Sequence, residues 1–566
     1  MKNPFVEEIA RQLAGPTGLA PDQVARSLSI PPAETQTDYA FPCFALAKTK
    51  RLKPTEIAQE LAQHVHPGEW IESAAVNGPY LNFRVARGKF IAWALERVRE
   101  EKTSYGCSDE GAGRTVVVEF SSPNIAKHLG VHHIRSTMIG NALTHIFTAL
   151  GYKVVSINFL GDWGTQFGIL MAAYRKWGTA ATLEGDAVSN LNALYVRFNQ
   201  EAKENPALRD EGRAWFKRLE DGDAEAVALW EQFRAISLAE FQKVYDLLGV
   251  KFEVLSGESL YDKLMPATIA RLEKLGLAKI DQGALIVDLS THKMPPVILR
   301  KSDGATLYDT RDIAAAEDRW EKYHFARMAY VVGGEQKLHF RQIFTTLQMM
   351  GYDWAKECVH VDFGMLRFQG AKMSGRQGQV VMLRQVLTEA IDRARQAIDQ
   401  KNPALPNKEA VAAAVGIGAV VFNDLKRQRS KDVDFDWDAI LSFEGETGPY
   451  VQYAHVRLCS ILRKYGQPVD AAADLSLLTE PEEFALAKAL ADFNSVIRRA
   501  ADGCEPSAVS QYLLELCGLF STYYHKHKVL TEDAPLTAAR IRLVDSLRQV
   551  IANGLRLLGM QTPEEM

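Results

Sequence analysis

Two unbroken apolar segments with a helical repeat between them define the central part of the chain. The segments are TVVVEF at 115–120 and KVVSINFL at 153–160. Continuous apolar runs of this kind are typical of parallel strands buried on both faces. The stretch between them, IRSTMIGNALTHIFTALGY at 134–152, carries apolar residues at helical spacing. The order strand, helix, strand predicts a βαβ unit.

The alternation returns further along the chain, after an interruption. PPVILR at 295–300, ARMAYVVGG at 326–334 and CVHVDFGML at 358–366 are expected strands, and LHFRQIFTTLQMMGY at 338–352 has helical period. A mostly polar helical stretch at about 174–290 separates the two parts and indicates an inserted domain. We therefore expect an α/β domain at 111–400, built on a Rossmann-like, doubly wound parallel sheet.

The two flanking regions show different patterns. Residues 1–110 predict a small α/β domain, with a helix in PTEIAQELAQHV and a strand pair around the turn in SAAVNGPYLNFRV, followed by the linker GCSDEGAGR. KNPALPNK at 401–408 marks a second boundary. Helical periods then dominate to the end of the chain, so residues 401–566 predict an α-helical bundle.

Composition narrows the class of protein. Of the 566 residues 47% are hydrophobic, and the formal net charge is −4. This charge excludes a bulk basic protein but allows a local basic face for RNA. The six cysteines form no CxxC pair, which favours reduced thiols over disulfides or a zinc ribbon. The N-terminal apolar stretch contains acidic residues, unlike a signal peptide, and no run approaches the about 20 apolar residues of a membrane span. We therefore expect a cytoplasmic protein without membrane contact.

The segment AKHLGVHHIRST, residues 126–137, lies between the first predicted strand and its helix. Ligands of such sheets bind at the carboxyl ends of the strands, where a helix N-terminus favours anions. Lys127, His128, His132 and His133 there suit a polyphosphate. A zinc site is less favoured, because His128 and His132 have no cysteine or carboxylate at ligand spacing. An ordinary histidine-rich helix start remains the alternative.

The segment GAKMSGRQGQ, residues 370–379, is the second candidate for chemistry. Its glycines with Lys372, Ser374 and Arg376 predict a cationic loop that could neutralise charge on a leaving pyrophosphate. The alternative is a solvated surface loop.

These two segments together resemble the HIGH and KMSKS motifs of class I aminoacyl-tRNA synthetases. The narrower resemblance is to the arginyl-tRNA synthetase family, and it covers essentially the whole chain. Five further blocks carry it, in the order of the family: EFSSPNIAK, FLGDWGTQFG, LYDTRDIAAA, YVVGGEQKLHFRQ and TGPYVQYAHVR.

The resemblance implies activation of L-arginine by ATP and transfer to the terminal ribose of tRNA(Arg). It implies ATP as a substrate, Mg²⁺ with the ATP, and no metal bound by the protein itself; we expect a monomer. It also implies that the N-terminal domain contacts the tRNA elbow and that the helical bundle binds the anticodon region.

The resemblance also implies roles for individual residues. Arginine binding falls on Glu119, Ser121, Asn124, Tyr308, Asp312 and Gln336. ATP binding falls on Gly130, His133, His339, Gln342 and Met373. Catalysis falls on Lys127, His133, Lys372, Ser374 and Arg376, to which we add His128 and His132 as candidates because the first motif is altered. Contact with tRNA falls on Tyr450, Gln452, Tyr453 and Arg457.

These roles are chemically coherent, since a guanidinium needs carboxylates and presents a planar fork to them. Each has an ordinary structural alternative. Asp312 could be an acid near a helix start, Tyr308 a strand residue, His339 a partly buried histidine and the tyrosines core residues. DWGTQFG is interpreted as structural, without a catalytic role.

The chain departs from both motifs. The HxGH positions are here Gly130, Val131, His132 and His133, so only the last histidine is retained. We hypothesise a rearranged histidine set: if the helix begins at His128, then His128 and His132, four residues apart, share a face, and either could supply the missing imidazole. In the second motif the usual lysine is Gly375, and Arg376 or Lys127 are candidates for its charge. A catalytically altered paralogue that binds RNA, or one that passes arginine to another acceptor, is the competing hypothesis.

Overall fold

The computed structural model describes residues 3–31, 37–302, 308–368, 371–372 and 381–566. The chain divides into two compact units. The first comprises Met1–Thr103, Ile461–Asp492 and Gly518–Val550, and the second comprises Ser104–Ser460, Phe493–Cys517 and Ile551–Met566. The helices of the C-terminal region are therefore divided between the units along their length.

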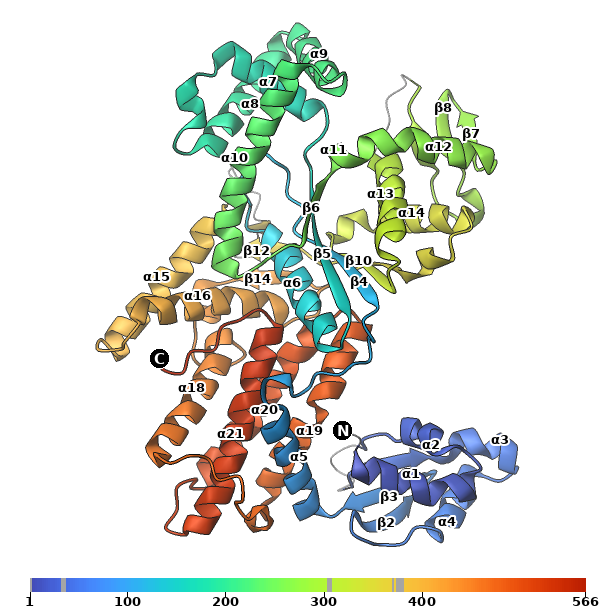
Figure 1. The fold of residues 1–566 in the computed structure, drawn as a ribbon, viewed down its shortest axis with the longest axis vertical. Helices are drawn as coiled ribbons and strands as arrows, with labels where there is room; N and C mark the ends of the chain where they lie inside the picture. The colour runs from blue at the N-terminus through green and yellow to red at the C-terminus, as the bar shows by residue number, and fades with distance from the viewer. Residues whose placement is uncertain (1–2, 32–36, 303–307, 369–370, 373–380) are drawn as a thin grey trace. The chain divides into compact units, whose positions relative to one another are not determined.

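Figure 1 labels most of the elements, whose bounds are as follows. The strands are β1 Tyr39–Pro42, β2 Ile71–Asn77, β3 Tyr80–Val85, β4 Thr115–Glu119, β5 Lys153–Leu160, β6 Val254–Gly257, β7 Ala278–Asp281, β8 Ala284–Val287, β9 Val297–Arg300, β10 Arg327–Tyr330, β11 Cys358–His360, β12 Leu366–Phe368, β13 Ala371–Lys372 and β14 Val433–Phe435. The α-helices are α1 Pro4–Thr17, α2 Pro21–Ser27, α3 Ala47–Lys50, α4 Pro54–Ala62, α5 Arg87–Glu101, α6 His133–Ala149, α7 Thr165–Trp177, α8 Ala187–Glu204, α9 Ala207–Glu220, α10 Ala224–Leu248, α11 Glu258–Tyr261, α12 Met265–Lys274, α13 Tyr308–Tyr323, α14 Lys337–Met349, α15 Leu383–Lys401, α16 Lys408–Leu425, α17 Trp437–Ile440, α18 Gly448–Tyr465, α19 Pro481–Asp502, α20 Ser507–Lys526 and α21 Ala534–Leu557.

A five-stranded parallel sheet forms the centre of the second unit, in the order β11-β10-β4-β5-β6. The predicted βαβ unit is β4, α6 and β5, with Val117 of β4 opposite Val155 of β5. On its other edge β4 pairs with β10, Val117 lying opposite Met328. The chain thus extends the sheet in one direction from β4 and later in the other. This reversal creates a switch point between β4 and β10, where open α/β sheets bind ligands.

Helices cover both faces of this sheet, as the apolar strands require. On one face α13 and α14 pack over Val117, Val155 and Ile157, with Ile313 and Ile343 in the same core. On the other face α6 lies so close to β4 that a Cβ on Gly140 would stand 2.1 Å from the Phe120 ring. Figure 1 shows α6 and the α13–α14 pair on opposite sides of the strands. The doubly wound architecture is therefore confirmed.

Two segments between β5 and β10 differ from the predicted topology. PPVILR becomes β9, but β9 joins β7 and β8 in a separate antiparallel sheet, so its assignment to the parallel sheet is wrong. Conversely, β6 lies within the stretch expected as an insertion and pairs with β5 along Ile157–Leu160. With four residues, β6 is too short for its apolar pattern to stand out from the polar helices around it.

Most of the remaining inserted stretch is helical, with the strands β7 and β8 near its C-terminal end. Helices α7, α8 and α9 pack around a small core that includes Ala172, Phe198 and Leu208.

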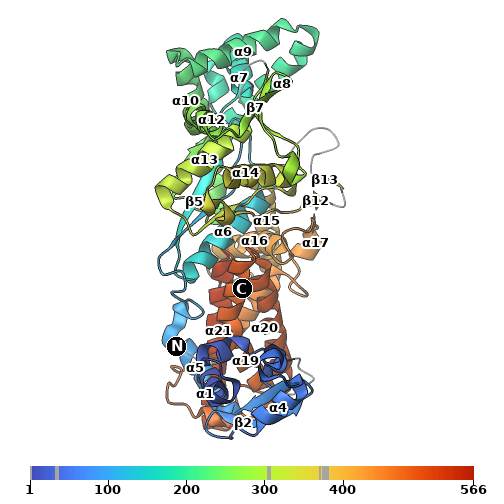
Figure 2. The same ribbon diagram turned by 90° about the vertical axis from the view of Figure 1, so that its right-hand side faces the viewer.

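The N-terminal residues of the first unit form the antiparallel sheet β1-β3-β2 with helices beside it. The predicted strand pair is β2 and β3, joined at Gly78, and the predicted helix is α4. Ile9, Ile57, Leu61 and Phe83 belong to its buried core. Figure 2 shows α1 and α4 next to β2. An independent core of this kind is what defines a separate domain.

The segments expected to form the C-terminal bundle are helical, from α16 to α21. Within the described part of the chain, no helix combines the length and the apolarity needed to cross a lipid bilayer.

Candidate active site

A cavity of about 420 Å³ opens at the switch point, beyond the carboxyl ends of β4 and β10. We call it the switch-point cavity. Backbone and side chains from the segments after both strands line it, together with the start of α6. Its lining residues are Ser121, Ser122, His132, His133, Arg135, Ser136, Val331, Val332, Gly333, Glu335, Phe363, Gly364, Met365 and Leu366. A cavity of this size accepts a small organic ligand.

The loop after β4 is held in an unusual backbone conformation. Ser121, Ser122 and Ala126 have φ of 70°, 48° and 59°, in the left-handed region that favours glycine. Hydrogen bonds from Ser121 N to Ser136 Oγ (2.9 Å) and from Ala126 N to Ser237 Oγ (2.8 Å) fix it. Ser122 Oγ is buried and has no hydrogen-bond partner among the described residues. Strain and an unpaired hydroxyl at one point are marks of a ligand site.

Two of the three predicted histidines line the switch-point cavity. The rings of His132 and His133 lie 4.1 Å apart, centroid to centroid. Burial, and then the proximity of His132, lowers the pKa of His133 to about 4. Burial also lowers the pKa of His132. His133 Nδ1 lies 3.1 Å from the Gly130 carbonyl, which can only accept, so Nδ1 carries the proton and Nε2 is left as the unprotonated nitrogen.

His128 lies elsewhere. Helix α6 begins at His133, so His128 and His132 do not share a helical face, and that premise of the hypothesis is wrong. His128 Nε2 instead contacts Ser189 Oγ (2.9 Å) and Asp186 (3.2 Å), and it lines a different cavity, of about 560 Å³. Lys127 is exposed, with Nζ 6.0 Å from the Tyr195 ring.

A short antiparallel ladder explains why the helix starts late. Val131 N donates to the Val381 carbonyl (2.9 Å), and Leu383 N donates to the Leu129 carbonyl (2.8 Å). Gly130, a predicted ATP contact, is buried within this ladder opposite Met382. The ladder ties the first motif to the chain just beyond the second one. Of the second motif, Lys372 has its backbone in β13, while Met373, Ser374 and Arg376 lie outside the described residues.

A buried ion pair lies beneath the arginine-binding residues expected from the sequence. Glu119, at the end of β4, contacts the guanidinium of Arg319 from α13, and both side chains are nearly inaccessible to solvent. Three aromatic rings surround that guanidinium, with centroids 5.3 Å (Phe159), 5.9 Å (Tyr261) and 5.5 Å (Tyr330) from Cζ. Burial raises the pKa of Glu119, against the effect of Arg319 and with that of Asp312.

Asp312 is partly accessible and is held by a histidine. Its Oδ2 lies 2.6 Å from His339 Nε2, and Asp309 Oδ1 lies 2.8 Å from Nδ1 of the same ring. Asp312 and Glu119 are near enough for each charge to influence the other. The structure thus brings these two predicted residues together at one edge of the sheet.

Glu258 is a third carboxylate at this edge, and the sequence reasoning did not identify it. It starts α11 directly after β6. Burial raises the pKa of Glu258 to about 7, opposed by Arg311 and reinforced by Asp312 and Asp162. Its nearest cation, Arg311, is 3.8 Å away, too far for a hydrogen bond. We call Glu119, Asp312 and Glu258 the acidic cup. The sequence feature that could have identified Glu258 is a glutamate directly after a short apolar run, but this run lies in the stretch assigned to the insertion.

Asp162, from DWGTQFG, anchors the helix that carries Glu258. It is fully buried, and its carboxylate accepts from Ser259 N (2.9 Å) and Ser259 Oγ (3.0 Å) in the first turn of α11. Gly257 has no Cβ, which at that position would stand 2.5 Å from this carboxylate. The structural interpretation of DWGTQFG agrees with these contacts.

The other predicted contacts differ in accessibility. Ser121 Oγ is buried against the Tyr245 hydroxyl at 2.8 Å, whereas Asn124 and Gln336 are exposed. Gln342 Nε2 donates to the Pro295 carbonyl at 2.8 Å. The side chain of Tyr308 lies outside the described residues. The predicted contacts whose side chains are described therefore range from buried to exposed.

The residues expected to contact tRNA lie on α18 in two groups. Gln452 is buried, and its Nε2 donates to the carbonyls of Ala414 (3.0 Å) and Gln561 (2.9 Å). Tyr453 is 40% exposed, and Arg457 Cζ lies 4.9 Å from its ring centroid. Tyr450 is half-buried, and burial raises its pKa. Tyr453 therefore presents its ring at the surface beside Arg457, while Gln452 supports the fold.

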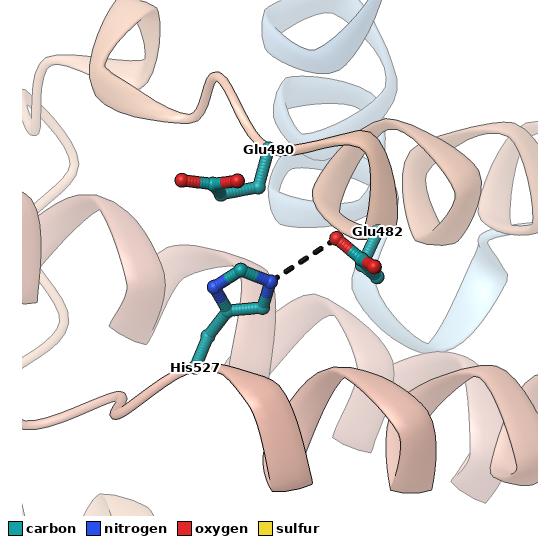
Figure 3. A group of neighbouring side chains, drawn as sticks. All are labelled: Glu480, Glu482 and His527. Carbon is teal, nitrogen blue, oxygen red and sulfur yellow. Dashed lines mark hydrogen bonds and ion pairs between the residues drawn. The ribbon is translucent and has the colours of Figure 1, made fainter.

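One further cluster, in the first unit, combines two glutamates with a histidine (Figure 3). The ligand atoms of Glu480, Glu482 and His527 lie within 4.8 Å of one another. Both oxygens of Glu482 are engaged, however: Oε1 accepts from Lys526 (2.6 Å), and Oε2 lies 3.1 Å from His527 Nε2. A charge network that satisfies itself in this way does not call for a metal ion.

Family models identify the class to which this arrangement belongs. The model "tRNA synthetases class I (R), catalytic domain" matches residues 96–437. The models "DALR anticodon binding domain" and "Arginyl tRNA synthetase N terminal domain" match residues 451–566 and 5–85. The parallel sheet, its switch-point cavity and these matches define a class I aminoacyl-tRNA synthetase.

Individual relatives narrow the assignment. The arginine–tRNA ligases of Clostridium botulinum (strain Okra / Type B1) and Clostridium perfringens (strain 13 / Type A) are 48% and 47% identical, over 99% of this chain and of each relative. The solved structure of Thermus thermophilus arginyl-tRNA synthetase is 30% identical, with a TM-score of 0.84 over 100% of both chains. The chain belongs to the arginyl-tRNA synthetase family.

Proposed function

We propose that the protein is an arginine–tRNA ligase. It activates L-arginine with ATP to arginyl-adenylate and pyrophosphate, and then transfers arginine to the 3′-terminal ribose of tRNA(Arg). The observation that carries this proposal is an acidic cup beside a nucleotide-sized cavity at the same edge of the sheet. A cation and a nucleotide bound there would meet at the carboxyl end of β4.

Arginine recognition is the task of the acidic cup. We infer that Asp312 and Glu258 pair with the guanidinium, because both are partly accessible. Tyr308 is a further candidate for this end of the substrate. Glu119 acts from behind, through its ion pair with Arg319. Asn124 and Gln336, both exposed, are suited to the α-amino group. The hydrogen bond of Ser121 N to Ser136 fixes the loop after β4 that carries Asn124.

Nucleotide recognition is the task of the switch-point cavity. His133 and His132 stand where the α6 N-terminus favours phosphate. In the first step a carboxylate oxygen of arginine bonds to the α-phosphorus, and the bond from that phosphorus to the bridging oxygen breaks. The electron pair leaves with pyrophosphate. Lys372, Ser374 and Arg376, with Lys127, are candidates for stabilising this charge, so the chemistry rests on positioning and electrostatics.

Mg²⁺ accompanies the nucleotide in this proposal rather than occupying a protein site. Among the described residues that line the switch-point cavity, Glu335 is the single carboxylate. One carboxylate suits a Mg²⁺ ion that keeps phosphate and water as its other ligands, and the ion would supply charge neutralisation on the triphosphate.

Binding of tRNA is assigned to surfaces outside the catalytic sheet. Tyr453 and Arg457 form an aromatic and cationic pair of the kind that stacks on unpaired bases. We propose that α18 contributes this contact and that the N-terminal domain contacts the tRNA elbow. We also propose that the protein acts as a monomer in the cytoplasm, where its six free cysteines would stay reduced.

The test is aminoacylation of purified tRNA with labelled arginine, lysine or citrulline. We expect charging with arginine alone, because lysine and citrulline would leave carboxylates of the cup unpaired. D312N should lower the rate of aminoacylation with arginine by at least about 100-fold. D318N, a matched change on the same helix at a residue paired with Lys322, should leave it within about twofold. Absence of charging with intact tRNA would contradict the proposal.

A further inference from the structure

His339 connects the first turn of α14 to α13 through both of its ring nitrogens. Nδ1 lies 2.8 Å from Asp309 Oδ1, and Nε2 lies 2.6 Å from Asp312 Oδ2. Asp309 and Asp312 are three residues apart on α13, so they project from the same face of that helix. The imidazole is only 8% exposed, so the ring itself is largely shielded from water.

This geometry determines the charge of the ring. An ionised carboxylate only accepts hydrogen bonds, so each ring nitrogen facing one must carry a proton. Burial alone would lower the pKa of His339, but the hydrogen bonds of Asp309 and Asp312 outweigh it and raise the pKa to about 9. At neutral pH the bridge is therefore carboxylate, imidazolium, carboxylate.

The bridge leaves one oxygen of Asp312 for a ligand. His339 occupies Oδ2, while the carboxyl group as a whole remains 28% exposed. The imidazolium also offsets repulsion in the acidic cup, where the charges of Glu119 and Glu258 both respond to Asp312. A neutral side chain at this position could hold one carboxylate but could not supply the charge.

We propose that His339 is a positioning residue for arginine binding: as an imidazolium held by Asp309, it orients the Asp312 carboxylate toward the guanidinium of the substrate. The inference rests on the proposed function and adds a residue that acts through another. It differs from the nucleotide contact implied by the family resemblance. His339 does not belong to the described lining of the switch-point cavity, and both its nitrogens are already engaged.

The experiment measures arginine and ATP binding separately by calorimetry on the full chain, which requires neither tRNA nor turnover. In H339Q we expect arginine affinity to fall about tenfold or more, the loss of one charge-assisted hydrogen bond, with ATP affinity changed less than about twofold. D309N should weaken arginine binding in the same direction but less. H145Q is the matched control, since His145 is a partly buried imidazole on α6 that lies against the backbone of Arg556 and Leu557.

A pH series distinguishes two roles of His339, namely orienting Asp312 through its positive charge and merely filling space beside it. The ratio of wild-type to H339Q arginine affinity cancels ionisation of the substrate itself. Because the pKa of His339 is raised, its contribution is complete below about 6.5 and is lost as pH rises through about 9. The groups that face the bridge are Asp309 and Asp312 from α13, and Glu119 and Glu258 act on Asp312 from β4 and α11.

Several results would overturn the inference. They are unchanged arginine affinity in both H339Q and D309N, a loss confined to ATP, or a ratio that does not vary with pH. If H339Q fails to fold, D309N still decides, because it keeps the histidine and removes only its support. Failure of the wild-type protein to bind arginine would instead reject the proposed function itself, so the two failures are distinguishable.

Discussion

The acidic cup and the switch-point cavity lie at the same edge of one sheet but are built on opposite principles. In the cup, Glu119 is engaged by Arg319 and Asp312 by His339 before any substrate arrives. In the cavity, His133 is held uncharged, and Ser122 Oγ is buried without a partner among the described residues. The acidic cup therefore has its charged partners in place without a ligand, whereas the histidine of the switch-point cavity is still uncharged.

The difference follows from the two ligands. A guanidinium carries a fixed charge on a planar fork, so its partners must be charged and oriented before it binds. Buried carboxylates need neighbouring cations in order to stay ionised. A polyphosphate brings its own strong negative charge, which can raise the pKa of nearby histidines on binding. Under the proposed function, specificity for arginine is thus prepared before the substrate binds, whereas the nucleotide end is expected to respond to its ligand.

The largest effect should come from removing the cation beneath the cup. R319M leaves Glu119 buried without its counter-ion, which should cost about 3–5 kcal/mol of stability and abolish arginine binding. The urea midpoint of unfolding and calorimetry with arginine measure both. The double variant E119L/R319M should recover much of the stability but not the binding. Full arginine binding by the double variant would show that the Glu119–Arg319 ion pair is not needed to arrange the charges of the cup.

The next effect concerns the cup residue whose partner cation, Arg311, is too far away for a hydrogen bond. Glu258 has a pKa near 7, so it is largely protonated at pH 6 and ionised at pH 8. Arginine affinity should therefore rise as pH increases through 7. E258Q should lower affinity at pH 8 by about 10- to 100-fold and remove this rise. Calorimetry at the two pH values is the measurement, and a rise that persists in E258Q would assign it to another group.

The nucleotide end should show a smaller effect of opposite sign. Because the pKa of His133 is about 4 in the free protein, ATP binding should take up protons, and affinity should increase as pH falls from 8 to 6. Calorimetry in two buffers of different ionisation enthalpy detects the uptake. H133N should remove it and weaken ATP binding about tenfold, with arginine binding unaltered. Equal uptake by H133N would mean that ionisation of ATP itself accounts for it.

A variant outside both regions calibrates the comparison. Y453A removes a stacking surface on α18 and should weaken tRNA binding by about 1 kcal/mol while arginine and ATP binding are kept. Filter binding of tRNA measures this, with K464A, an exposed lysine on the same helix, as control. A loss in K464A equal to that in Y453A would indicate a general charge effect rather than stacking.

Local patterns were reliable where the physical cause was local. The apolar runs at β4 and β5 and the helical period of α6 predicted the βαβ unit because buried strands and amphipathic helices have characteristic spacing. The same reasoning failed for β9, since an apolar segment does not reveal which sheet it joins. It also missed β6, and Glu258 with it, because four residues carry too little pattern.

The histidine segment shows the same limit at the site. Spacing alone suggested one helical face for His128 and His132, but the ladder between Leu129–Val131 and residues 381–383 prevents a helix there. That pairing joins positions some 250 residues apart, and pairing over such separations depends on closing a long loop rather than on local preference.

The amino-acid sequence by itself determined the class of fold, the family and the chemical types of residue needed for a guanidinium and a polyphosphate. Only the tertiary structure decided which carboxylate is accessible, which is neutralised from behind and which histidine orients an aspartate. These properties depend on burial and on partners brought together from distant elements. Desolvation and Coulomb energy vary with the surroundings of a group and not with its neighbours along the chain.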